Sequence, residues 1–128
     1  MPLVRISLMQ GRPVEFSRRV GEIVYQTMAE KLFIPAKDNF QVITQHDRNS
    51  LIYSIDYLGI RRTDGIIFIQ ITLSEGRTVE HKKAFFKRLV ERLHQELQIR
   101  TEDVLINLIE VKKENWSFGN GIAQYANL

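Results

Sequence analysis

The first third of the chain reads as strand, helix, strand. Apolar and polar residues alternate from Leu3 to Met9, which predicts a strand with one buried face. Apolar residues then recur at helical spacing from Phe16 to Leu32. Pro13 suits the first turn of that helix, and Pro35 ends it. A second strand is expected over Phe40 to Thr44.

A later segment follows the same plan. Ile66 to Leu73 is rich in β-branched residues and nearly continuous in apolar character, which is typical of a strand covered on both faces. Thr78 is a plausible N-cap for a helix whose apolar positions extend from Phe86 to Leu97. Val104 to Val111 is the expected closing strand.

The linking segment Asp47 to Gly65 is long for a plain loop. Within it, Leu51 to Tyr53 could form a short strand or hairpin. After the last strand comes a glycine-rich turn that carries two aromatic residues, Trp116 and Phe118.

The two strand-helix-strand segments repeat each other at a fixed offset of 65 positions, without a gap. The matching pairs are Gly11-Arg12 with Gly76-Arg77, Val14-Glu15 with Val79-Glu80, Leu32 with Leu97, Ile34 with Ile99, Asp38 with Asp103, Ile6 with Ile71 and Leu8 with Leu73. A constant offset indicates a duplicated supersecondary unit, and each unit implies a right-handed parallel crossover. We therefore expect one α/β domain over 1–128, a duplicated β-α-β unit with a four-stranded sheet and two helices. The units span about 2–46 and 66–112, and an aromatic turn occupies 113–128.

Composition narrows the class of protein. The chain is 44% hydrophobic and 26% charged, which is typical of a globular domain, and it has no cysteine, which excludes disulfides and thiolate chemistry. Neither a secretory signal nor an apolar run of membrane-spanning length is visible, so we expect a cytoplasmic protein that makes no membrane contact. The net charge of +3 favours anionic partners, either a carboxylate substrate or a nucleic acid, but a mildly basic solvated surface is its more usual explanation, and we expect no nucleic-acid partner.

Common catalytic motifs are absent. No phosphate-binding loop follows Gly11 or Gly76, and no nucleophile-elbow serine is present. The three histidines, His46, His81 and His94, lack metal-ligand spacing, so we expect neither a metal nor another cofactor. His81 and His94 lie among charges on the second predicted helix, where we expect them to be solvated.

The start of the chain offers a catalytic group. Met1 precedes Pro2, a small residue of the kind that usually permits removal of an initiator methionine. Pro2 would then be a secondary amine at the start of a strand. An α-amino group titrates at about 7.7–8.0, and desolvation or nearby cations bring such an amine further into the range of a general base. If Met1 is retained, Pro2 has no free amine.

Four stretches carry a resemblance to a known family. The turn from Leu73 to Lys82 resembles the strand-to-helix turn of the 4-oxalocrotonate tautomerases. The stretches Ile34 to Gln41, Gln45-His46 and Trp116 to Gly121 resemble the fused, double-unit members of the tautomerase superfamily, above all the malonate semialdehyde decarboxylases. This resemblance spans nearly the whole chain.

The resemblance implies roles for individual residues. Pro2 is the expected catalytic amine, Arg77 the ligand of the substrate carboxylate, and Asp38 a residue that orients or activates water. The implied apolar wall consists of Trp116, Phe118 and Tyr125. The family also implies a homotrimer acting on a small carboxylate-bearing substrate.

Several functions remain open from the sequence. The first is keto–enol proton transfer on small 2-oxo acids. The second is decarboxylation of 3-oxo acids, but Glu75 stands where the decarboxylases carry a second arginine. Asp103 repeats Asp38, so both aspartates could be turn residues, and Arg12 is interpreted as structural or as part of an interface. The further alternatives are a non-catalytic family member and an RNA-binding ferredoxin-like domain, although the strand Ile66 to Leu73 offers only Phe68 for stacking on bases.

Overall fold

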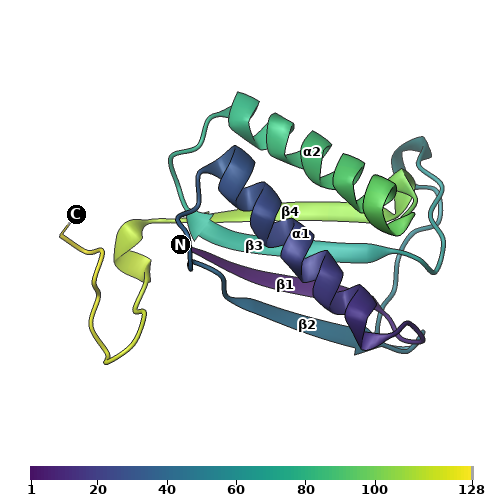
Figure 1. The fold of residues 1–128 in the computed structure, drawn as a ribbon, viewed down its shortest axis with the longest axis horizontal. Coiled ribbons are helices and arrows are strands. Elements are labelled where there is room, and N and C mark those ends of the chain that lie inside the picture. The colour runs from purple at the N-terminus through teal and green to yellow at the C-terminus, as the bar shows by residue number, and fades with distance from the viewer. Residues whose placement is uncertain (128) are drawn as a thin grey trace.

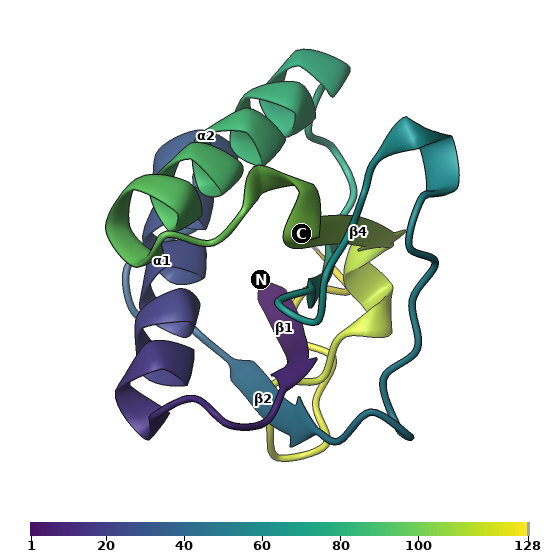
Figure 2. The ribbon, with the colours of Figure 1, turned by 90° about the vertical axis from the view of Figure 1, so that its right-hand side faces the viewer.

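The computed structural model of the protein describes residues 1–127 and has two layers, a four-stranded sheet and two helices that lie side by side on one of its faces (Figures 1 and 2). The strands and helices, in chain order, are β1 Pro2–Met9, α1 Val14–Leu32, β2 Gln41–His46, β3 Ile67–Ser74, α2 Val79–Leu97 and β4 Val104–Val111. Short 3-10 helices lie between β2 and β3 at Tyr57–Gly59, between α2 and β4 at Thr101–Asp103, and after β4 at Lys113–Asn115. This architecture confirms the duplicated β-α-β fold.

The sheet has the order β2-β1-β3-β4. Each unit pairs its own two strands in parallel, β1 with β2 and β3 with β4, while the central pair β1–β3 is antiparallel. In that central pair Pro2 lies opposite Leu73, and Leu8 lies opposite Ile67. The start of each unit therefore meets the end of the other unit's first strand, and the molecule has two related ends.

The core lies between the helices and the sheet face beneath them. Alternate strand residues such as Ile6, Ile69 and Ile71 are fully buried there. Both helices pack on the same face of the sheet, so within the single chain β3 is covered on one face, and the coverage of its second face stays a prediction. On the opposite face of β3, Gln70 is exposed within this chain.

Matching turns confirm the repeat. Gly11 and Gly76 both have positive φ, +111° and +127°, a conformation that favours glycine. Phe33 and Gln98, at equivalent positions, both adopt the left-handed conformation that ends a helix. Thr78 caps α2 as predicted, because its side chain accepts a hydrogen bond from the backbone of His81.

The segment between the units contains no strand at 51–53, so that expectation was wrong. Here the backbone is held by a side chain instead of by a sheet. The Arg62 guanidinium donates to the carbonyl oxygens of Ser54, Tyr57 and Ile60, at 3.4, 3.1 and 3.2 Å. These bonds supply partners that a neighbouring strand would otherwise provide.

After β4 the chain runs past the end of the sheet that carries the N-terminus (Figure 1). This part corresponds to the aromatic turn predicted at 113–128, of which residue 128 lies outside the described residues. Among residues 1–127, neither helix has the length and apolar character required to cross a bilayer.

Candidate active site

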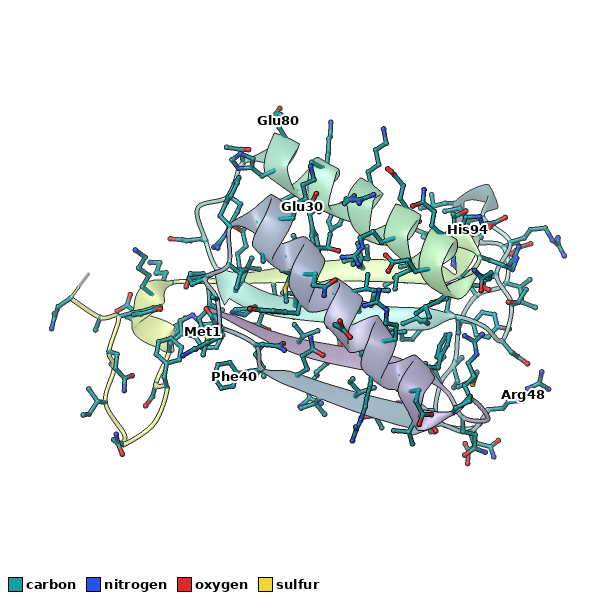
Figure 3. All side chains as sticks on the ribbon, viewed as in Figure 1. Met1, Glu30, Phe40, Arg48, Glu80 and His94 are labelled. Carbon is teal, nitrogen blue, oxygen red and sulfur yellow. The ribbon has the colours of Figure 1, made fainter. Side chains whose placement is uncertain are left out.

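A cleft of about 570 Å³ opens at the end of the sheet where β1 begins and β3 ends. It lies between the ends of several elements, and Met1 marks its position in Figure 3. Its walls include side chains from the chain start, the end of α1, the β3–α2 turn and the C-terminal turn, namely Met1, Phe33, Glu75, Arg77, His81 and Tyr125. Three of the predicted site regions therefore meet here.

Asp38 lies next to the N-terminal amine of the chain. The nitrogen of Met1 is 3.4 Å from Asp38 Oδ2, and the two side chains are only 12% and 11% exposed. Asp38 Oδ1 is buried and has no hydrogen-bond partner among the described residues. Buried polar atoms normally have partners, so this oxygen is available to a proton donor that enters the site.

Arg77 lies partly buried between two backbone carbonyls. Its Nε and Nη2 both donate to Leu32 O, at 3.1 and 3.0 Å, and its Nη1 donates to Ser74 O at 3.0 Å. A guanidinium carries five N–H donors, so one remains on each terminal nitrogen. Two such donors suffice for bidentate binding of a carboxylate.

The three predicted aromatic residues form a contiguous group. Trp116 Nε1 donates to Ser74 Oγ at 3.1 Å, and the Trp116 ring stacks on Phe118 at 5.6 Å between centroids. Phe118 meets Tyr125 edge-on at 4.6 Å. Tyr125 itself lines the cleft, and the other two rings adjoin it through these contacts.

His81 is a residue that sequence reasoning missed. The expectation that it is solvated was wrong, since it is partly buried and lines the cleft. Its ring lies edge-on to Phe33, 5.0 Å between centroids. The signal in the sequence was its spacing of four residues after Arg77. His94, at the other end of α2, is exposed as expected.

The equivalent residues of the other unit lie at the opposite end of the sheet, near Arg48 in Figure 3. Arg12 lines a separate hollow there and lies over the ring of Phe16, 4.1 Å from its centroid. Asp103 is only 1% exposed. It accepts hydrogen bonds from the backbone N–H of Thr63 at 2.8 Å and from its hydroxyl at 2.5 Å.

The carboxyls with displaced pKa values lie away from the cleft. A hydrogen bond from Arg92 lowers the pKa of Glu96, at the far end of α2. The backbone N–H of Glu102 and the hydroxyl of Thr101 lower the pKa of Glu102, just before β4. No three His, Asp or Glu side chains in residues 1–127 gather into a possible metal site.

Comparisons with known proteins agree with this geometry. A family model described as "Tautomerase enzyme" matches residues 38–119, which include Asp38 and Arg77. The probable tautomerase YusQ of Bacillus subtilis (strain 168) is 42% identical over 124 residues, covering 97% of this chain and 98% of the relative. The probable tautomerase YrdN of the same organism is 31% identical, covering 98% and 96%.

Solved structures extend the similarity to three dimensions. FG41 malonate semialdehyde decarboxylase, inhibited by 3-bromopropiolate, is 36% identical with a TM-score of 0.89, covering 96% of this chain and 93% of that one. A fused 4-OT symmetric trimer shares the fold at 20% identity and a TM-score of 0.79, covering 98% and 99%. With its duplicated unit, this chain belongs to the tautomerase superfamily as a double-unit member.

Proposed function

We propose that this protein catalyses keto–enol proton transfer on small 2-oxo acids, using the amine of Pro2 after removal of Met1. The observation that carries the proposal is the approach of the Met1 nitrogen to Asp38, 3.4 Å away, at the end of the cleft that holds Arg77. Removal of Met1 would make the Pro2 nitrogen the N-terminal amine, at the start of β1.

The proposed reaction needs one base and one anchor. Arg77 holds the substrate carboxylate through its two unused N–H groups. The Pro2 amine removes a proton from the carbon next to the carbonyl, and the C–H electron pair becomes the new C=C bond. The carbonyl electron pair moves onto oxygen, which takes up a proton to give the enol. Ketonisation is the same sequence reversed.

Asp38 has a place in this scheme. Its Oδ2 lies 3.4 Å from the nitrogen of Met1, the residue bonded to Pro2, and its unpartnered Oδ1 can accept a hydrogen bond from substrate or water. A carboxylate beside the amine stabilises the protonated form that follows proton abstraction. Asp38 therefore supports the amine while Arg77 holds the substrate.

The second candidate is decarboxylation of a 3-oxo acid. Two observations favour it: the unpartnered oxygen of Asp38, which could hold water, and the 36% identity to a malonate semialdehyde decarboxylase. Here protonated Pro2 would polarise the carbonyl while the carbon–carbon bond to the carboxylate breaks and carbon dioxide leaves. We rank it second because Glu75, a carboxylate, lines the cleft beside Arg77.

Covalent labelling tests the role of Pro2. Intact mass of the natively expressed protein should show loss of Met1, and bromopyruvate at neutral pH should attach once, at Pro2. An α-amine titrates near 8 and a lysine near 10.4, so at pH 7 about a tenth of the former is neutral but less than about one in a thousand of the latter. The matching variant, Pro2→Ala, should lower kcat for enol decay by about 10²- to 10⁴-fold, whereas Pro13→Ala at the opposite end should not. Label spread over Lys82, Lys83 and Lys87, or a retained Met1, would remove Pro2 from the mechanism.

We also propose a homotrimer. The sheet face opposite the helices carries apolar side chains that are two-fifths exposed in the single chain: Leu3, Val42, Leu105 and Ile109. Burial of such a patch favours association, and a relative of the same fold is described as a symmetric trimer. Light scattering at micromolar concentration should give three times the chain mass, and a stable monomer would contradict this assembly.

A further inference from the structure

Two polar side chains that line the cleft have no role so far, the exposed ammonium of Lys113 and the imidazole of His81. His81 is partly buried at the start of α2, among the residues that line the cleft with Arg77. Neither ring nitrogen makes a hydrogen bond within residues 1–127, although the backbone N–H of His81 is bound by Thr78. The ring is held from one side by Phe33, edge-on at 5.0 Å. A ring that is held by an aromatic contact while both of its nitrogens stay free suits a ligand-binding group.

The repeat shows what this position does geometrically. Phe16 is the equivalent of His81 in the first unit, and Arg12 is the equivalent of Arg77. There the guanidinium lies 4.1 Å from the aromatic centroid. The turn thus allows the side chain four residues after the arginine to reach it. In the second unit that aromatic position carries an imidazole, and the guanidinium is anchored to Leu32 O instead.

The charged groups that line the cleft favour a further hydrogen-bond donor for an anionic substrate. Arg77 has only two unused N–H donors, and the Glu75 carboxylate, which repels an anion, lines the same cleft. A carboxylate has about four lone-pair sites, so a bidentate arginine leaves some of them open. A further donor in the cleft would compensate for that repulsion.

We propose that His81 is a second substrate-binding residue, which donates an imidazole N–H to the substrate carboxylate held by Arg77 and thereby sets the preference for acids. This inference rests on the proposed function of the cleft. It assigns no proton transfer to His81. Its contribution falls on binding, so it should appear in KM and leave kcat nearly unchanged.

The test replaces the imidazole by a ring without nitrogen. In His81→Phe the edge-on contact with Phe33 is retained and the donor is lost, so KM for phenylpyruvate should rise about tenfold with kcat within about twofold. His81→Asn, which keeps a donor, should recover part of the loss. The matched control is His94→Phe, the same change on the exposed far end of α2, which should leave KM unaltered. Thermal unfolding of each variant verifies the fold.

A direct binding measurement separates this inference from the proposed function. Proton NMR of the imidazole signals follows His81 during titration with phenylpyruvate, with His94 as the internal reference. Movement of the His81 signal at saturating acid, even in a protein without tautomerase activity, would support the binding role while refuting the reaction. Normal tautomerase activity with an unmoved His81 signal and an unchanged KM in His81→Phe would overturn the inference and leave the proposed function standing.

Discussion

The two ends of the sheet carry equivalent aspartates whose hydrogen-bond partners differ. Asp103 is buried and receives two hydrogen bonds from Thr63, with Arg100 Nη1 at 3.2 Å as an ionic partner. Asp38 is its equivalent at the other end, yet one of its oxygens has no partner and the other faces a backbone amine. The residue type is the same, and the difference lies in what precedes each unit's first strand.

The two arginines also differ in their surroundings. Arg12 is exposed and rests on an aromatic ring. Arg77 is partly buried, and backbone carbonyls from two elements fix its guanidinium at the cleft. A repeated motif therefore marks a repeated turn, not a repeated site. The end with the fully hydrogen-bonded aspartate is interpreted as structural, and the end with an immobilised arginine and an unpartnered aspartate oxygen as the candidate binding site.

The largest expected difference in activity is that between the two arginine variants. Arg77→Ala should reduce kcat/KM for 2-oxo acids by an amount equivalent to about 2–5 kcal/mol, because it removes a charged, partly desolvated donor. Arg12→Ala should leave kcat/KM within about twofold. Steady-state enol decay, measured well below the unfolding temperature of each variant, checks the pair. Equal losses at both positions would break the distinction between the two ends.

The aspartates should separate activity from stability. Asp103→Asn should lower the free energy of unfolding by about 1–3 kcal/mol, because Thr63 loses a buried acceptor, and should leave kcat intact. Asp38→Asn should lower kcat at least tenfold and should lower the free energy of unfolding less than Asp103→Asn does, since Oδ1 has no partner to lose and only the contact of Oδ2 with the N-terminal amine is weakened. Urea titration and enol decay are the two measurements. A stability loss in Asp38→Asn with unchanged kcat would make both aspartates structural.

The smallest effect concerns the residue before each turn glycine. Glu75 and Gln10 occupy equivalent positions, and Glu75 lines the cleft. Glu75→Arg makes the local field more positive and adds a second carboxylate donor, so carbon dioxide release from malonate semialdehyde should rise a few-fold relative to enol decay. Gln10→Arg is the control and should change neither rate. If wild-type protein already releases carbon dioxide efficiently and lacks tautomerase activity, the order of the two proposed functions reverses.

The features of the fold that depend on residues close in sequence could be predicted from the sequence. The period of the apolar residues located both helices and all four strands, and the fixed offset revealed the duplication. Gly11 and Gly76 identified turns that need positive φ. The resemblance supplied Pro2, Asp38 and Arg77, whose neighbourhood at one end of the sheet follows from the antiparallel central pair.

Long-range contacts were not readable. The side-chain anchor of 51–62 depends on Arg62 folding back onto three carbonyls, and no local pattern encodes that arrangement. The place of His81 depends on Phe33, which belongs to the other unit and reaches the cleft only because it ends α1 in the left-handed conformation. Whether a strand face is covered likewise depends on where both helices dock.

The bond from Arg77 to Leu32 O has a dynamic consequence. Leu32 is the last residue of α1, and helix ends open more readily than helix centres. While the last turn of α1 is closed, the guanidinium is already immobilised, so less side-chain entropy is lost when a ligand binds. When that turn frays, the anchor is released. Amide exchange near Leu32 should therefore slow when a carboxylate occupies the cleft. The affinity for that ligand then depends on how often the last turn of α1, in the other repeat, is open.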